Sequence, residues 1–189
     1  MILVLIVLLA TPHGLVSLGT PGGVALRTLD GRTVDPFAGR QRATAFVFVH
    51  ADCPVTSRYA PELNRLFDEA ASRIRVWLVY PGRDEDETAI QAHYREHGLR
   101  APALRDPGFR LADRAGATIT PEAAVFARTA TGPRLVYRGR IDDRAVRPGV
   151  WRPVAGARDL AAVLDRLGRG EDVTPLTTQA VGCYIRPLS

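Results

Sequence analysis

The stretch HADCPVTSRYAPEL, residues 50–63, directly follows the apolar run ATAFVFV of residues 43–49. Such a run is typical of a central strand buried on both faces, and Pro54 suits the first turn of a helix. Cys53 is therefore expected at a helix N-terminus, where the helix dipole favours a thiolate. The stretch predicts a strand, a reactive cysteine and a helix in that order.

The rest of the chain alternates strand and helix patterns. Apolar spacing predicts an order of strand, helix, strand, helix, then a β-hairpin and a last helix, which is typical of an α/β sandwich with a mixed sheet. Residues 142–156 are predicted to form a loop, and the tail has no strong periodicity. Strands are expected within 24–34, 43–49, 74–82, 102–105, 118–128 and 134–142, and helices within 54–73, 84–98, 108–116 and 157–170.

The composition is that of a globular protein and argues against nucleic-acid binding. The chain has 189 residues, of which 46% are hydrophobic and 24% charged, enough for one domain with a substantial core. Its net charge of +5 comes from arginines alone, because it contains no lysine. These arginines are scattered rather than clustered, so we expect no nucleic-acid partner.

The N-terminal apolar run, residues 2–10, is too short to span a bilayer and suits the core of a signal peptide. We therefore expect a signal peptide over 1–19, a single domain over 20–176 and a C-terminal tail over 177–189, with no stable membrane span. This division predicts export to the periplasm or the extracellular space, where disulfides persist. A buried first strand and a misassigned start codon remain alternatives.

Three features resemble the redoxin group of thioredoxin-fold proteins. Pro61 lies eight residues after Cys53 and is followed by Glu62-Leu63, and a Thr120-Pro121 pair precedes the predicted hairpin. The likeness is to alkyl hydroperoxide reductase/thiol-specific antioxidant-like proteins and to exported TlpA/ResA-type thiol-disulfide proteins. YRGRIDDR, residues 137–144, and AVGCYIR, residues 180–186, resemble an exported bacterial subgroup of redoxins.

The resemblance implies a thioredoxin-like three-layer sandwich with a mixed central β-sheet. It also implies a cis bond between Thr120 and Pro121, in a loop that lies beside Cys53 and whose backbone pairs with an extended substrate. The implied activity is that of a thiol-dependent oxidoreductase or peroxidase. Its substrate would be a thiol/disulfide protein or a peroxide, its electron donor an external thiol, and it would need no organic cofactor.

Three positions depart from the standard members of these groups. Thr56 stands where a thioredoxin-type C-x-x-C motif has its second cysteine. His50 stands where a typical peroxiredoxin has a threonine, and Ser57 stands where a Sco-type copper chaperone has a second cysteine. These departures count, in turn, against a thioredoxin-type dithiol activity, a typical peroxiredoxin activity and a Sco-type copper chaperone activity.

The candidate catalytic residues are Cys53, Cys183, Thr56, Thr120 and Pro121. Cys53 is the expected nucleophile. Cys183, 130 residues later, is the only other cysteine and so the only intramolecular candidate to resolve an oxidised Cys53. A structural, intermolecular or metal-binding role for Cys183 stays open.

Two other functions remain possible. Cys53 and His50 together suit copper, because thiolate binds Cu(I) and imidazole binds copper generally. The fold could also be a binding module without turnover, in which case Cys53 would be buried and inert. His93 and His97 are more simply part of a solvated helix face than a metal pair.

The acidic pair Asp142-Asp143 lies between Arg140 and Arg144. This alternation of charge predicts a salt-bridged loop, with a catalytic carboxylate as the less favoured alternative.

Overall fold

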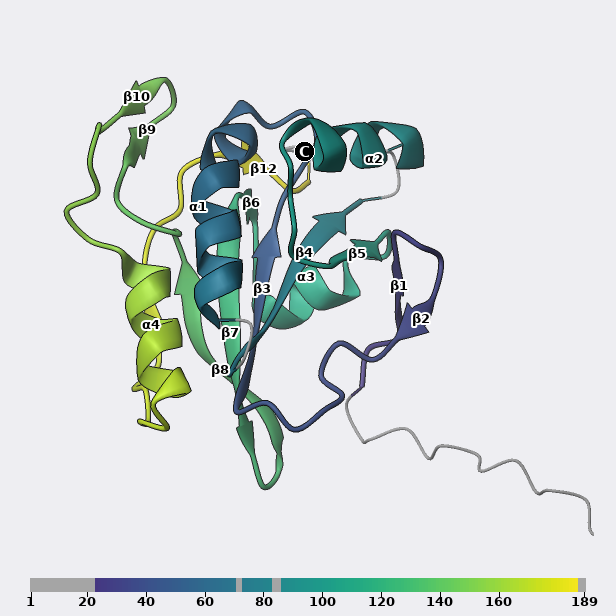
Figure 1. Ribbon diagram of the computed structural model, residues 1–189, viewed down its shortest axis with the longest axis vertical. Coiled ribbons are helices and arrows are strands. Elements are labelled where there is room, and N and C mark those ends of the chain that lie inside the picture. The colour runs from purple at the N-terminus through teal and green to yellow at the C-terminus, as the bar shows by residue number, and fades with distance from the viewer. Residues whose placement is uncertain (1–22, 71–72, 83–85, 187–189) are drawn as a thin grey trace, which may run out of the picture.

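Eight strands form one mixed sheet at the centre of the molecule (Figure 1). The computed structural model describes residues 23–70, 73–82 and 86–186, so the expected signal peptide lies outside the described residues. The strand order is β11-β8-β7-β3-β4-β5-β1-β2. β3, β4 and β5 are parallel, whereas β7 runs antiparallel to both β3 and β8. The predicted mixed sheet is thus confirmed.

The central strands coincide with the apolar runs of the sequence. The strands of the large sheet are β1 (Leu26–Thr28), β2 (Thr33–Val34), β3 (Ala43–Phe48), β4 (Arg75–Pro81), β5 (Ala103–Asp106), β7 (Glu122–Thr129), β8 (Gly132–Gly139) and β11 (Leu176–Thr177). β11 crosses the expected boundary between domain and tail.

The helices cover both faces of this sheet and complete three layers (Figure 1). α1 (Pro54–Ala70), α2 (Glu87–Glu96) and α4 (Asp159–Gly168) contribute buried side chains to one core, and α3 (Arg110–Ala115) contributes to the other. α1 continues through Pro61. None of the helices in the described ranges is long and apolar enough to cross a membrane.

β3 shows why the sheet lies between two cores. Its side chains alternate, as period-two geometry requires. Ala45 and Val47 pack with α1 and α4, whereas Phe46 and Phe48 pack with α3. Every residue of β3 is buried, which is typical of a central strand in an α/β protein.

Two regions contain strands that the sequence pattern did not predict. The expected loop over 142–156 contains a hairpin of β9 (Ala145–Arg147) and β10 (Val150–Trp151). In the tail, β12 (Cys183–Tyr184) pairs with β6 (Ile119–Thr120) in a separate two-stranded sheet. These strands have two or three residues each, too few for a hydrophobic period to mark them.

Candidate active site

Cys53 lies between the end of β3 and the start of α1. Its backbone N–H donates to His50 O at 3.2 Å, and its own carbonyl accepts from Ser57 N–H at 3.2 Å, which opens the helix. The predicted strand–cysteine–helix junction is therefore present. The side chain of Cys53 is only 1% exposed, however, so the thiol faces the protein interior.

The loop before β7 lies directly against this thiol. The Thr120–Pro121 peptide bond is cis, as the sequence predicted. Cys53 Sγ donates a hydrogen bond to Thr120 O at 3.1 Å. Glu122 supports the loop from behind, because its carboxylate accepts the N–H groups of Thr118 at 2.8 Å and Ile119 at 3.2 Å.

The C-terminal tail brings the second cysteine to the same place. β12 runs antiparallel to β6, with Cys183 opposite Thr120 and Tyr184 opposite Ile119. Thr120 Oγ1 also donates to Cys183 O at 3.3 Å. As a result, Cys183 lies close enough to Cys53 for each thiol to affect the pKa of the other, and the two sulfurs are not bonded to one another.

Four contacts hold the tail in this position. Ile185 is buried in the core beside α3, and its N–H donates to Thr118 O at 2.9 Å. Arg186 forms an ion pair with Asp113 at 2.8 Å and lies 4.2 Å from the ring centre of Phe109. The tail is therefore held against the domain by an apolar side chain, Ile185, and by a charged side chain, Arg186.

Gly182 allows the tail to approach the loop closely. A Cβ atom at this position would lie 2.0 Å from Thr120 O, a backbone atom that cannot rotate away. Only glycine fits this contact without a shift of the backbone. Gly182 thus controls how near Cys183 comes to Cys53.

The environment makes the two thiols unequal. Burial raises the pKa of Cys53, but hydrogen bonds from the Cys183 thiol and from Thr56 outweigh it, so the net pKa lies below its usual value. Burial together with the hydrogen bond and charge of Cys53 raises the pKa of Cys183 to about 12. Cys53 is therefore the thiol that ionises, and Cys183 is the proton donor beside it.

Thr56, at the position of the missing second cysteine, contributes to this environment. Its side chain is buried in the first turn of α1, and its Oγ1, which meets no other hydrogen-bond partner among the residues described, is left to interact with the Cys53 sulfur. Both its backbone and its side chain lower the pKa of Cys53. Thr56 thus supplies hydrogen-bond donors that stabilise the Cys53 thiolate, at the position where a C-x-x-C motif has its second cysteine.

The prediction for His93 was wrong, because its side chain is not solvated. It is only 4% exposed, and its Nδ1 lies 2.9 Å from Tyr80 Oη. Burial and the nearby His97 and His50 lower the pKa of His93 to about 4. The sequence signal for this burial is Ile90, an apolar residue three positions earlier and so on the same helix face. Ile90 is fully buried in the structure.

No cluster of three or more potential metal ligands occurs within residues 23–70, 73–82 and 86–186. His50 Nδ1 accepts the N–H of Asp52 at 3.2 Å, so this ring nitrogen is directed at the backbone. A copper site would have to rest on Cys53 and the other nitrogen of His50.

The acidic pair after β8 forms salt bridges, as the sequence predicted, but with Arg144 and Arg152, whereas Arg140 pairs with Asp159. Asp142 is buried; its carboxylate accepts from Tyr59 Oη at 2.7 Å and from Arg144 Nε at 2.7 Å. Asp143 pairs with Arg152. This network connects α1 to the β9–β10 hairpin, so its evident role is structural.

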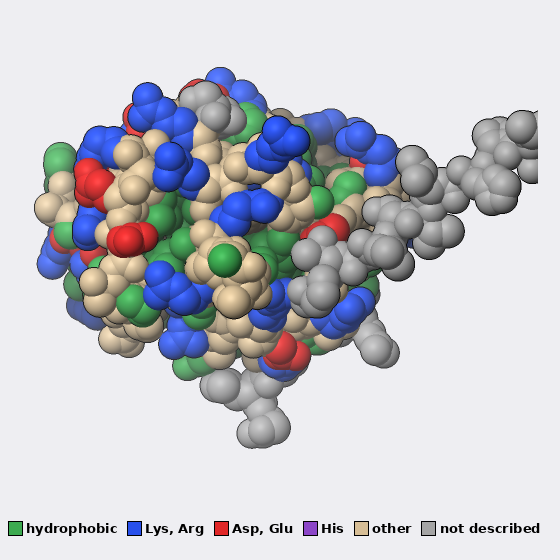
Figure 2. Space-filling view, turned by 90° about the horizontal axis from the view of Figure 1, so that it is seen from below, with side chains coloured by type: hydrophobic (Ala, Val, Ile, Leu, Met, Phe, Trp, Pro, Cys, Tyr) green, Lys and Arg blue, Asp and Glu red, His purple; other side chains and the backbone are tan. Residues whose placement is uncertain are grey.

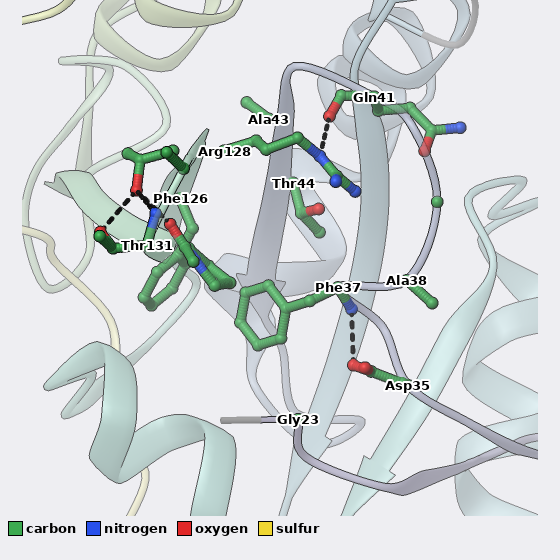
Figure 3. Close-up of a pocket in the computed structure, with 15 residues that line it drawn as sticks. Gly23, Asp35, Phe37, Ala38, Gln41, Ala43, Thr44, Phe126, Arg128 and Thr131 are labelled. Atoms are coloured by element: carbon green, nitrogen blue, oxygen red, sulfur yellow. Dashed lines mark hydrogen bonds between the residues drawn. The ribbon is translucent and has the colours of Figure 1, made fainter. Parts of the chain in front are cut away.

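A cavity of about 470 Å³ lies at the far end of the sheet, around the start of β3. Phe37 and Phe126 form its apolar wall, and Arg128 and Thr44 lie across from them (Figure 3). Figure 2 shows this end of the molecule, where arginines alternate with apolar side chains rather than forming one basic patch. Since Cys53 follows the opposite end of β3, this cavity is separate from the thiol site.

The arrangement of layers, cis-proline loop and cysteine identifies the fold. The fold is thioredoxin-like. The structure is similar to that of a secreted Mycobacterium tuberculosis disulfide oxidoreductase homologous to E. coli DsbE. That pair shares 18% identity and a TM-score of 0.53 over 78% of this chain and 96% of the other. At this identity the likeness shows a common fold alone.

Two further structures are more similar. An uncharacterized conserved protein from Geobacillus kaustophilus has 26% identity and a TM-score of 0.72, over 88% of this chain and 90% of its own. A hypothetical protein from Sinorhizobium meliloti has 24% identity and a TM-score of 0.70, over 87% and 90%. No family model and no curated protein sequence matches the chain.

The structure thus brings together all five predicted site residues: Cys53, Cys183, Thr56, Thr120 and Pro121. It adds Glu122 and Gly182, which sequence reasoning missed. An acidic residue directly after a Thr-Pro pair, and a glycine directly before the second cysteine, are the signals that could have indicated them.

Proposed function

We propose that the protein is a thiol-disulfide oxidoreductase in which Cys53 is the nucleophile and Cys183 resolves it. The observation that carries this proposal is the β6–β12 pair, which holds Cys183 beside the Cys53 thiol across 130 residues of sequence. The tail thereby takes the part that a second cysteine at position 56 plays in a C-x-x-C motif.

The reaction proceeds by two exchanges. The Cys53 thiolate attacks a substrate disulfide, one substrate sulfur leaves as a thiolate, and a mixed disulfide with Cys53 remains. Cys183, after losing its proton, then attacks Cys53 Sγ and releases the second substrate sulfur. The substrate gains two electrons and the protein loses two, held as a Cys53–Cys183 disulfide.

The difference in pKa between the two thiols sets the order of these steps. The charge and hydrogen bonding of Cys53 are among the causes that keep the Cys183 pKa high. Once Cys53 is in a mixed disulfide, it carries no charge, and this obstacle to ionisation of Cys183 disappears. Cys183 therefore becomes a nucleophile only after Cys53 has reacted.

A disulfide is a better match to the site than a peroxide. The position that carries a threonine in typical peroxiredoxins holds His50, whose Nδ1 is bound to the backbone N–H of Asp52. If a peroxide does react, Cys53 becomes a sulfenic acid with loss of an alcohol or water, and Cys183 condenses with it to the same disulfide and water. The end state of the protein is identical.

The N-terminal apolar run supports the further proposal that the protein works after export, in an oxidising compartment. The similar M. tuberculosis disulfide oxidoreductase is a secreted protein.

Mass spectrometry of the oxidised protein tests the proposed function. Treatment with oxidised glutathione should produce a two-dalton loss and a peptide that links Cys53 to Cys183. Cys183→Ser should stop at the stage of a glutathione adduct on Cys53. A Cys53 that stays a free thiol under these conditions would show a binding module without turnover.

The copper hypothesis makes a different prediction. It requires Cu(I) binding that is lost in both Cys53→Ser and His50→Ala and is retained in Cys183→Ser. Titration of the reduced protein with Cu(I) against a competing chelator distinguishes the two functions.

A further inference from the structure

Glu122 is a buried carboxylate at the junction between the cis-proline loop and the central sheet. It is the first residue of β7, and its backbone stands opposite Phe48, the last residue of β3. Its side chain is only 5% exposed. A buried carboxylate is costly unless its oxygens are paired, so the partners of Glu122 indicate what this residue holds in place.

One oxygen of Glu122 binds the loop. Oε2 accepts the backbone N–H groups of Thr118 at 2.8 Å and Ile119 at 3.2 Å. The other oxygen, Oε1, lies 3.7 Å from Nε of Arg138, whose guanidinium also donates to Gly116 O. Hydrogen bonds to a carboxylate are stronger than those between neutral groups. Two consecutive loop residues are therefore fixed to the first residue of β7 through one oxygen atom.

The carbonyl groups of the same loop make the contacts of the redox pair. Thr120 O accepts from Cys53 Sγ at 3.1 Å, and Thr118 O accepts the Ile185 N–H of the tail at 2.9 Å. The loop thus has N–H groups on Glu122 and carbonyl groups on Cys53 and on the tail that carries the second cysteine. A displacement of this loop would move one cysteine relative to the other.

The sheet connects Glu122 to Cys53 by a short route. Cys53 follows β3 closely in the chain, and Glu122 is paired with the last residue of that strand. Cys183 stands opposite Thr120, two residues before Glu122. The position of the Glu122 carboxylate therefore affects where the loop, and with it Cys183, lies relative to the strand that carries Cys53.

We propose that Glu122 is a positioning residue for the thiol-disulfide exchange: its carboxylate oxygen holds residues 118–120 where the sulfurs of Cys53 and Cys183 can form a disulfide. The inference rests on the proposed Cys53–Cys183 disulfide. It gives Glu122 no part in proton transfer, so the position of the oxygen matters for the reaction and its charge does not.

Two conservative substitutions separate the position of this oxygen from its charge. Glu122→Gln keeps a carbonyl oxygen at the same reach, which can accept both N–H groups, but it loses the charge that faces Arg138. Glu122→Asp keeps the charge but is shorter by one methylene group, which withdraws the oxygens from the loop. Positioning predicts an impaired Asp variant and a Gln variant close to the parent.

The measurement is the equilibrium of the full chain with glutathione. Two molecules of reduced glutathione reduce one protein disulfide and become one molecule of oxidised glutathione, so the constant reports how well the two cysteines are placed for bonding. After acid quench and alkylation, mass spectrometry counts the reduced, disulfide and glutathione-adduct forms. Glu122→Asp should disfavour the protein disulfide by about tenfold and accumulate an adduct on Cys53, because misplaced reacting groups lose effective molarity.

Leu167→Ala is the control for stability alone. Leu167 is buried in α4, in the core on the face of the sheet opposite α3. Its truncation should lower the free energy of unfolding, because it leaves a cavity. Its glutathione equilibrium, like that of Glu122→Gln, should stay within about twofold of the parent value, as for sites that do not interact. Glu122→Ala, which removes the acceptor altogether, is the second variant should Glu122→Asp fail to fold.

Three results would overturn the inference. Equal constants for the parent and Glu122→Asp would show that the loop does not need this oxygen. An equal loss in Glu122→Gln would assign the effect to charge, and an equal loss in Leu167→Ala would assign it to stability. In these cases the proposed function stands, whereas a parent protein that forms no Cys53–Cys183 disulfide would overturn the proposed function as well.

Discussion

Cys183 stands directly opposite Thr120 in the β6–β12 pair, and the carbonyl of the same threonine accepts the hydrogen bond of Cys53. One backbone residue therefore places both sulfurs. The redox pair depends on how two short strands align rather than on spacing within one helix turn, so its properties should respond to changes in the tail.

The ionisation of Cys53 should depend on Cys183. Because the Cys183 thiol donates to the Cys53 sulfur and lowers its pKa, the rate of Cys53 alkylation by iodoacetamide should rise with pH through a midpoint below about 8.5, the ordinary value for cysteine. Cys183→Ala removes this donor and should shift the midpoint upward. A parent midpoint at or above the ordinary value, or no shift in the variant, would show that the tail does not activate Cys53.

Gly182→Ala should separate the tail from the loop. Its new methyl group would collide with Thr120 O, so we expect a loss of about 1–3 kcal/mol in the free energy of unfolding and a disulfide that forms on the order of tenfold more slowly. Urea unfolding and timed alkylation measure the two effects. Gly108→Ala is the control, because its Cβ would meet only Arg110 at an ordinary 3.7 Å. Equal rates in both variants would contradict the tail contact.

His93 should make the protein less stable in acid. Its pKa is lowered to about 4 in the folded protein from 6.5, so between these values the unfolded chain binds more protons and stability falls as pH falls. The loss attributable to His93 is up to about 3 kcal/mol between pH 6.5 and 4. His93→Phe removes this titration, although Tyr80 loses a partner at every pH. Urea unfolding at several pH values should therefore give a flatter profile in the variant, and parallel profiles would refute the assignment.

The Asp142 network should be a large contributor to stability. Asp142→Ala leaves Arg144 without its buried partner and removes an acceptor from Tyr59, for an expected loss of about 3 kcal/mol in the free energy of unfolding. Asp68→Asn, which breaks an exposed ion pair with Arg100, should cost about 1 kcal/mol or less. Urea unfolding of both variants checks this difference, and similar losses would mean that the buried network adds little.

The sequence predicts the fold well where elements are long and have a clear pattern. The fully buried run of β3 and the apolar spacing of α1 and α4 were each enough to identify an element. The β9–β10 hairpin and β12 were missed, because strands of two or three residues are determined by the partner they meet and not by their own composition.

The site was predictable residue by residue, but its arrangement was not. Cys53 and Pro121 were recognisable from their neighbours in the chain. The approach of Cys183 depends on a contact between positions 63 residues apart, Thr120 and Cys183, which no local pattern encodes. His93 was misjudged because its burial depends on packing against Tyr80, a residue of another element.

The two margins of the large sheet have a consequence for behaviour at high concentration. β2 at one margin and β11 at the other are only two residues long. Strands this short give a second molecule almost no ladder to extend, which protects a sheet against edge-to-edge pairing, although β11 covers only Tyr137 and Arg138 of the eight-residue β8. At high concentration, pairing between the sheets of two molecules should therefore be hindered at the β2 margin, and the stretch of β8 before Tyr137 is the part of the opposite margin that a second chain can extend.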